Sequence, residues 1–175
     1  MITIYKASAA DAAMLTQLAR SIYKEHYLHL WHPGGADWYM NEYAYAAHKI
    51  AAELADPPVE YFIAASDGQP LGYMKLNTAT TLDENTNALE IERIYLYKNV
   101  SGKGIGRQLM ALALQRAQEL KRDMLFLKAM DSSTDAIAFY QKLGYVICGS
   151  LQLPMPEFSL MKEEYRGMVI LKRSV

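Results

Sequence analysis

One stretch, residues 89–109, constrains the fold more than any other part of the chain. Its first part, LEIERIYLY at residues 89–97, is rich in β-branched and aromatic residues and is typical of a strand. A glycine-rich turn, SGKGIG, follows at residues 101–106. Beyond the turn, apolar residues recur at helical spacing as far as Leu120. The sequence therefore predicts a strand, a glycine turn and a long helix in direct succession.

The glycine turn has the chemistry of an anion-binding loop. Glycine has no Cβ atom, so the backbone can approach a ligand closely and adopt positive φ. The free N–H groups and the dipole of the following helix favour an anion, typically a phosphate. Lys103 and Arg107 add positive charge at the same end of the helix. We interpret this turn as a pyrophosphate-binding loop.

Two common phosphate loops do not match these residues. A P-loop requires a Lys-Ser or Lys-Thr pair after its glycines, and none follows here. A dinucleotide fingerprint, G-x-G-x-x-G, requires a third glycine where this chain has Arg107 or, starting one glycine later, Leu109.

Composition indicates one globular domain covering residues 1–175. The chain is 51% hydrophobic and 21% charged, and its net charge of −1 provides no basic field for nucleic acid. The single cysteine, Cys148, excludes an internal disulfide and suits a reducing compartment, and we expect it to be a buried, unreactive strand residue. No targeting pattern and no membrane-spanning run is present, so we expect a cytoplasmic protein with no membrane partner.

The remaining segments alternate between the two kinds of secondary structure. A Ser8–Asp11 capping box predicts the start of the first helix, and Asp67-Gly68 predicts a hairpin turn. The expected helices cover residues 12–27, 37–55, 105–120 and 134–143, and a polar loop is expected at 78–87. The expected strands cover residues 2–6, 61–65, 71–76, 89–97, 124–129, 145–149 and 167–172, the last two antiparallel to each other. This mixture of hairpins and crossovers predicts an α+β (mixed α/β) fold.

Two motifs in this order and spacing resemble the GNAT superfamily of N-acetyltransferases. Residues 101–106 are similar to its Q/R-x-x-G-x-G/A loop, with Ser101 at the first position. Residues 133–145 are similar to its N-x-x-A-x-x-F-Y-x-K-x-G-F segment, with Ser133 in place of Asn and Tyr145 in place of the last Phe. Residues 72–76, 89–96 and 167–171 look like the PaiA-type branch, which acetylates polyamines, although the Trp-Glu-x-Asn run of that branch is Met130-Asp131-Ser132-Ser133 here.

The resemblance implies the GNAT acyl-CoA N-acyltransferase fold, a central mixed, twisted sheet with helices on both faces. It also implies acetyl-CoA as cosubstrate and no metal. The backbone of residues 94–96 would pair with the pantetheine arm at a strand edge splayed from the next strand. The residues that it places at the cofactor are Ile94, Tyr95, Leu96, Ser101, Gly102, Lys103, Gly104, Ile105, Gly106, Arg107, Ser133 and Tyr140.

Acetyl transfer to an amine also needs proton donors and acceptors. Tyr140 is the candidate acid toward the leaving thiolate, since a phenol of pKa about 10 can donate to it; the alternative is a plain core tyrosine. Glu92 is the candidate base, directly or through water, and shares a strand face with Glu90. The alternatives are a face that is solvated or ion-paired with Arg93 or Lys75, and proton removal by water alone.

Aromatic residues of the first two helices suit an alkylammonium acceptor through cation–π contact. Tyr27, Trp31 and Tyr39 are the candidate substrate-binding residues, and the wider group adds Tyr23, Trp38 and Tyr43, interleaved with Glu25, Asp37 and Glu42. The alternative is that many of them pack in the core. A metal site at His26, His29 and His32 is one interpretation, and surface or pocket-lining histidines are the preferred one.

The sequence therefore predicts an N-acetyltransferase in which a small primary amine, preferably a polyamine, attacks the thioester of acetyl-CoA directly. The rivals are a protein or peptide N-acetyltransferase and a non-catalytic acyl-CoA-binding sensor. Dimers are common in the superfamily, so the resemblance also raises a homodimer as a candidate state.

Overall fold

The computed structural model describes residues 1–175 and contains one seven-stranded mixed sheet. The strand order across the sheet is β1-β2-β3-β4-β5-β7-β6. The strands are β1 (Ile2–Lys6), β2 (Val59–Ser66), β3 (Gln69–Leu82), β4 (Asn85–Leu96), β5 (Met124–Met130), β6 (Val146–Gln152) and β7 (Gly167–Ser174). The helices are α1 (Ala12–Tyr27), α2 (Gly35–Trp38), α3 (Ala47–Ala55), α4 (Ile105–Glu119) and α5 (Thr134–Lys142).

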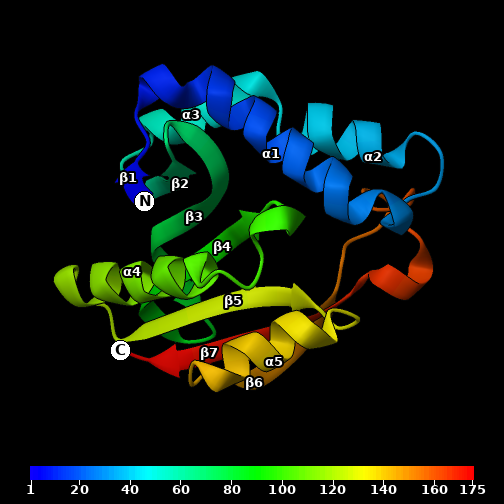
Figure 1. Ribbon diagram of the computed structural model, residues 1–175. Coiled ribbons are helices and arrows are strands. Elements are labelled where there is room, and N and C mark those ends of the chain that lie inside the picture. The colour runs from blue at the N-terminus through cyan, green and yellow to red at the C-terminus, as the bar shows by residue number, and fades with distance from the viewer.

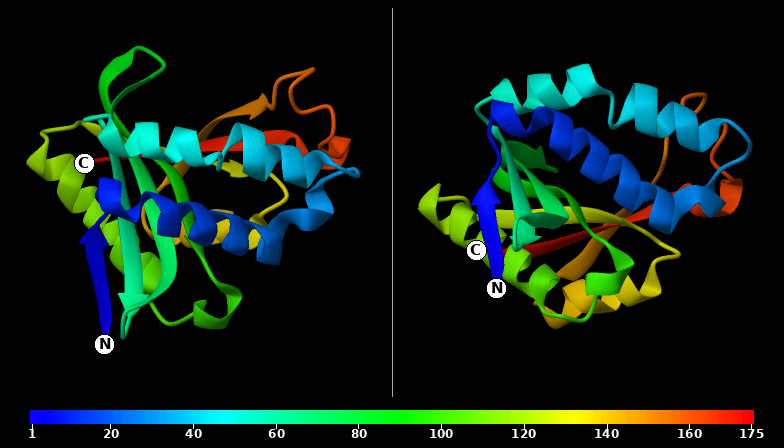
Figure 2. Two further views of the ribbon diagram at one scale, coloured as in Figure 1. Left: turned by 90° about the horizontal axis from the view of Figure 1, so that it is seen from above. Right: turned by 45° about the horizontal axis from the view of Figure 1, so that its top comes forward.

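Helices cover both faces of this sheet, as Figure 1 shows, and α1 runs alongside α2 and α3 in Figure 2. Residues of α1 and α3, such as Ile22 and Ile50, form one buried cluster with Tyr61 and Tyr73 of the sheet. A second cluster lies under α4 and includes Leu109. The predicted mixed α/β fold with helices on both faces is confirmed.

Strands β4 and β5 are parallel neighbours for only a short distance. The pairing joins Ala88–Glu90 to Met124–Phe126 and then stops. The strands diverge beyond it, so the β5-facing backbone edge of β4 has no strand partner from Ile91 to Leu96. The splayed edge expected from the family resemblance is therefore present.

A β-bulge interrupts β4 at Glu92. Lys75 of β3 pairs with Arg93, and the next residue, Leu76, pairs with Ile91, which leaves Glu92 without a partner. A bulge adds one residue to a strand and breaks the alternation of its faces. Glu92 and Arg93, adjacent in sequence, therefore lie on the same side of β4 and form an ion pair.

The second predicted helix is interrupted, which corrects the expected continuous span over residues 37–55. One π-helical turn, Tyr39–Tyr43, follows α2, and α3 starts only at Ala47. Between them, Tyr45 is buried and its carbonyl accepts a hydrogen bond of 3.0 Å from Arg20 Nε of α1. The helix is interrupted because Tyr45 is buried against the sheet. The sequence has no helix-breaking residue at this point, so it does not indicate the interruption.

The polar loop predicted for residues 78–87 is wrong, because β3 and β4 continue as a hairpin through it. Thr80 pairs with Ala88, Leu82 is buried, and Asp83 adopts φ 52° in the turn. The β-branched threonines of this segment suit a strand. In contrast, the Asp67-Gly68 hairpin is confirmed, with φ of 50° and 77° at these two residues.

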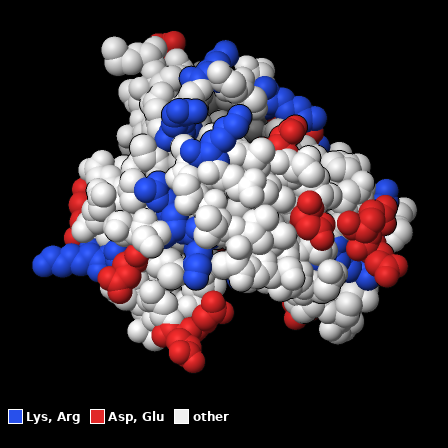
Figure 3. Space-filling model, turned by 90° about the horizontal axis from the view of Figure 1, so that it is seen from below, with Lys and Arg blue, Asp and Glu red and all other residues white.

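The prediction that Cys148 is buried is wrong. Cys148 is exposed, because β6 is the last strand of the sheet and its residues Val146 and Ile147 are also about half exposed. None of the helices combines the length and the apolar character needed to cross a membrane. On the face drawn in Figure 3, acidic side chains lie mostly toward the margins and basic ones nearer the middle, with wide uncharged areas between them.

Candidate active site

Two cavities lie against the unpaired edge of β4. We call the one bordered by the glycine turn the glycine-loop cavity, of about 610 Å³. The other, of about 420 Å³, is lined by tyrosines of α1 and the π-helical turn, and we call it the tyrosine cavity. The residues that line both are Tyr27, Ile94, Tyr95, Ala136 and Tyr140. The cavities therefore meet at the splayed strand, with α5 on its far side.

The glycine turn leaves an open cradle at the start of α4. Gly102 and Gly104 adopt φ of 80° and 81°, and no atom lies within 4 Å of the place where a Cβ would stand on either residue. Gly106 and Arg107, also on the cavity wall, lie in the first turn of α4. Free helix N–H groups, an arginine and space for close backbone approach fit a pyrophosphate group.

Most of the predicted cofactor residues come together here. The predicted residues on the wall of the glycine-loop cavity are Ile94, Tyr95, Leu96, Ser101, Gly102, Gly104, Gly106, Arg107 and Tyr140. Three others lie elsewhere: Lys103 is exposed on the turn, the Ile105 side chain is buried in the core under α4, and Ser133 lines the tyrosine cavity.

His26 lines the glycine-loop cavity and was not predicted at the cofactor site. Its Nε2–H donates a hydrogen bond of 2.8 Å to the carbonyl of Leu96, the last residue of β4. The neighbouring Glu25 accepts a hydrogen bond of 2.8 Å from the Lys98 N–H. The end of α1 therefore fixes the chain between β4 and the glycine turn, a long-range contact that no local sequence signal indicates.

Tyr140 reaches the junction of the cavities from α5. Burial raises the pKa of its phenol well above 10, and the nearby hydroxyls of Tyr27 and Tyr145 raise it further. The phenol therefore keeps its proton at neutral pH. A protonated hydroxyl at this junction can donate a hydrogen bond or a proton to an atom held between the two cavities.

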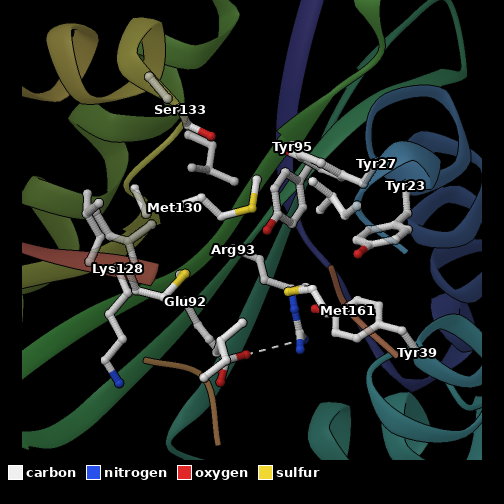
Figure 4. A pocket seen from close by; sticks show the side chains of 18 of the residues that line it. Tyr23, Tyr27, Tyr39, Glu92, Arg93, Tyr95, Lys128, Met130, Ser133 and Met161 are labelled. Carbon is white, nitrogen blue, oxygen red and sulfur yellow. Dashed lines mark ion pairs between the residues drawn. The ribbon is translucent and has the colours of Figure 1, made fainter. Parts of the chain in front are cut away.

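Aromatic side chains form the wall of the tyrosine cavity, as Figure 4 shows. Tyr23 and Tyr27 come from α1, Tyr39 and Tyr43 from the π-helical turn, and Tyr95 from β4. The candidate substrate-binding residues Tyr27 and Tyr39 are therefore on the wall. All five belong to or pack against the cluster under α1, so the predicted alternative of packing also applies to them.

Trp31 is not on this wall, which corrects its predicted place. It is 6% exposed and sits behind Tyr23, to whose hydroxyl its Nε1–H donates a hydrogen bond of 2.9 Å. Trp31 packs against Tyr39 and Phe158, and Trp38 packs against Trp31 and Tyr43. The two tryptophans support the tyrosines from behind.

Glu92 and Arg93 line the cavity and belong to a chain of ion pairs of alternating sign that continues behind its wall. Lys75 forms ion pairs with Glu53 at 2.7 Å and with Glu92, and Glu92 Oε2 lies 3.3 Å from Arg93 Nη1. Burial alone would raise the pKa of Glu92, but the charges of Arg93 and Lys75 outweigh it and the pKa is lowered. Glu92 is therefore ionised at neutral pH and holds a proton weakly.

Glu90 and Glu92 share the predicted face. Asn77 Nδ2 donates to Glu90 Oε1 at 2.8 Å and to Glu92 Oε1 at 3.3 Å. Ion pairing with Lys75 or Arg93 is the alternative to a role of Glu92 as base, and the structure contains both ion pairs. The bulge that brings Arg93 to this face was not predicted, since strict alternation would put it on the other one.

The three histidines near the end of α1 do not converge. His29 packs edge-on against Tyr165, whereas His26 is bound to the Leu96 carbonyl. No group of three or more His, Cys, Asp or Glu side chains is arranged to hold a metal ion.

Comparison with known proteins identifies the family. The profile of the acetyltransferase (GNAT) family matches residues 16–145, which include β4, the glycine turn and α5. The chain therefore belongs to the GNAT family of acetyltransferases.

Two curated relatives and one solved structure illustrate the range of similarity. An uncharacterized N-acetyltransferase from the pepI 3′ region of Lactobacillus delbrueckii subsp. lactis is 34% identical over 55% of this chain and 57% of its own length. The aminoalkylphosphonate N-acetyltransferase of Salmonella typhimurium is 31% identical over 60% of this chain and 70% of its own length. The PaiA N-acetyltransferase of Thermoplasma acidophilum, solved with coenzyme A, has a TM-score of 0.78 and 19% identity, over 100% of this chain and 99% of that one.

Proposed function

We propose that the protein transfers the acetyl group of acetyl-CoA to a small primary amine. One observation carries the proposal: a cavity with an anion-binding loop and an aromatic cavity meet at the unpaired edge of β4, beside the Tyr140 hydroxyl. Such a junction brings two ligands together with a proton donor between them, which is what direct transfer from one to the other requires.

The glycine-loop cavity is the proposed cofactor site. The turn at Gly102 and Gly104, with Arg107, would hold the pyrophosphate, and the backbone of Ile94 and Tyr95 would pair with the pantetheine arm. Acetyl-CoA supplies a thioester, whose carbonyl is open to attack by an amine. A backbone N–H on the free edge of β4 is the proposed donor to that carbonyl oxygen.

Two side chains have proposed proton roles. The Tyr140 phenol, protonated because of its raised pKa, is the proposed donor to the departing sulfur. Glu92 is the proposed acceptor of the amine proton, through water, because its carboxylate is already occupied by Lys75 and Arg93. The lowered pKa of Glu92 makes it a weak base. Binding of an amine that has already lost its proton in solution is therefore an equally good route to the attacking neutral amine.

The acceptor site is the tyrosine cavity. Its volume of about 420 Å³ suits a small molecule better than a peptide, which needs an open groove. The sequence resemblance favours a polyamine acceptor, and the Salmonella relative is named for aminoalkylphosphonates. Both are primary amines and are the two classes to test first.

The experiment is free-thiol release from acetyl-CoA with four amines: spermidine, 2-aminoethylphosphonate, an aminoglycoside and a lysine peptide. We expect turnover with at least one small amine and little with the peptide. We expect Tyr140→Phe to lower kcat about 10²- to 10⁴-fold, the usual contribution of a positioned general acid.

The controls separate the roles. Tyr165→Phe removes a hydroxyl from a tyrosine on neither cavity wall and should leave kcat unchanged. Turnover that Tyr140→Phe leaves intact would discard Tyr140 as the acid while keeping the enzyme. Coenzyme A binding by calorimetry without thiol release for any amine would favour the acyl-CoA sensor.

A further inference from the structure

Two charged side chains of the tyrosine cavity, Glu92 and Arg93, each have a buried atom without a hydrogen-bond partner, and Arg93 is the donor of the two. Its side chain is 13% exposed and lines the cavity, yet its Nη1 atom is buried without a hydrogen-bond partner. Other arginines of this chain donate well-formed bonds: Arg122 reaches the Thr78 carbonyl and Asn87 Oδ1, and Arg166 reaches the carbonyl of Met161. A buried guanidinium with an unused donor is costly unless something satisfies it.

Glu92 is not a complete partner for Arg93. Its Oε2 atom lies 3.3 Å from Arg93 Nη1 but outside hydrogen-bond geometry, and the same oxygen is ion-paired with Lys75. Glu53, Lys75, Glu92 and Arg93 thus alternate in sign and sum to zero, with Arg93 at the end of the chain. Because these four charges balance, it is the unpartnered Nη1 donor of Arg93, and not an excess of positive charge, that remains open to a second anion.

Apart from the Glu92 carboxylate, the surroundings of Arg93 are tyrosine hydroxyls and aromatic rings. Its guanidinium carbon lies 5.2 Å from the centre of the Tyr45 ring. The hydroxyls of Tyr39 and Tyr95 point toward the same region in Figure 4. Burial raises the pKa of both phenols, so they stay protonated and can donate. A second ammonium group, as in a polyamine, would meet a fixed positive charge here.

We infer that the acceptor amine carries an anionic group, a phosphonate, phosphate or carboxylate, and that the Arg93 guanidinium binds this group in the tyrosine cavity. The inference rests on the proposed function and narrows its substrate class. The planar fork of arginine matches two oxygens of such a group and makes charge-assisted hydrogen bonds to them. The amine end would then extend toward Tyr140, which lies on the wall of the same cavity.

The test compares matched amines on the whole protein with acetyl-CoA. The set is 2-aminoethylphosphonate, β-alanine, n-propylamine and 1,3-diaminopropane, which are similar in length and differ in the terminal group. For wild type we expect kcat/KM with one of the anionic amines to exceed that with propylamine by about 10- to 100-fold, the effect of charge-assisted hydrogen bonds. The first two compounds distinguish a phosphonate from a carboxylate.

Variants then assign the preference to Arg93. Arg93→Gln should remove it, mainly through a higher KM for the anionic amine, so that kcat/KM with this amine no longer exceeds that with propylamine. Arg93→Lys keeps the charge but loses the fork, and it should restore part of the preference. Lys24→Gln removes one positive charge from an exposed position on α1 and should leave the preference intact.

The result that overturns the inference is a wild-type preference for the diamine or propylamine, or an anion preference that survives Arg93→Gln. Calorimetric titration of 2-aminoethylphosphonate in the presence of coenzyme A makes the test independent of turnover. If no amine is acetylated, the proposed function fails. The anion site then stands if wild type binds the compound and Arg93→Gln does not, and falls if neither binds it.

Discussion

At the scale of single residues, Tyr140 links the two cavities. It lies on both walls, as the phenols Tyr27 and Tyr95 also do, and it is the one of the three that α5 presents opposite the free edge of β4. Burial matters as much as position, because it keeps the phenol protonated across the range in which amines lose their protons. The competing interpretation from sequence, a core tyrosine, also applies in part, because Tyr140 packs against the cluster under α4 as well as lining both cavities.

The pH dependence of kcat/KM follows from this environment. We expect the wild-type rate to rise with pH as the acceptor amine deprotonates, toward its ordinary pKa of about 10.4 for a lysine-like amine. We expect no decline of kcat/KM at any pH below 10, because the raised pKa of Tyr140 keeps the proposed acid protonated there. Glu92 should add no inflection between pH 5 and 8, because its pKa is lowered from 4.5.

A pH–rate profile with an alkylamine acceptor measures this directly. A decline centred below pH 10 that disappears in Tyr140→Phe would contradict the raised pKa of Tyr140. An acidic inflection near pH 6 that disappears in Glu92→Gln would identify a base with a raised pKa, which is opposite to the shift that Lys75 and Arg93 produce.

At the scale of elements, the glycine turn before α4 is the part whose conformation and function are most closely tied. Gly104 has φ 81° and stands at the N-cap of α4, where an added Cβ would meet no protein atom. A methyl group there would face the space proposed for the pyrophosphate. Gly68 in the β2–β3 turn has nearly the same φ, 77°, and equally open surroundings, but it lies on neither cavity wall.

Gly104→Ala and Gly68→Ala therefore form a matched pair. Both should lower the free energy of unfolding by about 1 kcal/mol, because alanine is strained at positive φ. Only Gly104→Ala should raise the Kd for coenzyme A, about 10-fold or more, since a close backbone contact with phosphate is lost. Calorimetry and urea unfolding measure the two quantities. Equal Kd values for both variants and wild type would remove the turn from the cofactor site.

At the scale of the whole molecule, a buried charge cluster holds distant parts of the chain together. Glu60 of β2 is 5% exposed and accepts two hydrogen bonds from Arg116 of α4, at 2.7 and 3.0 Å. Lys6 of β1 contacts the same carboxylate at 3.2 Å. Burial tends to raise the pKa of Glu60, but bonds from Arg116 and Lys6 outweigh it and the pKa is lowered.

Glu60→Gln should lower the free energy of unfolding by about 3 kcal/mol at pH 7, because it leaves Arg116 without its buried partner. Glu119→Gln removes the other, exposed carboxylate partner of Arg116 and should cost much less, because solvent screens this pair. Since the folded-state pKa of Glu60 is lowered, its stabilisation is present above pH 4.5 and lost as the pH falls through the folded-state value. The difference in the free energy of unfolding between wild type and Glu60→Gln, measured with urea, should therefore be smaller at pH 3 than at pH 7. A gap that is constant with pH would contradict the shift.

The sequence by itself determined the features that depend on neighbouring residues. The glycine turn and α4, the hairpin at Asp67-Gly68 and the α5 segment that carries Tyr140 follow from local backbone preferences and motif spacing. These signals were sufficient for the fold class, the family and most residues of the glycine-loop cavity. They were insufficient at residues 78–87, where polar composition hid two strand ends that only pairing reveals.

Tertiary structure alone decided how the tyrosine cavity is built. The bulge at Glu92, set by the register against Lys75, turns Arg93 into the cavity. Packing against Phe158 takes Trp31 off the wall and leaves Tyr39 on it. Register and burial depend on contacts between residues far apart in the chain, so no local pattern encodes them. Acceptor recognition, which depends on these contacts, was therefore the part of the site least accessible from sequence.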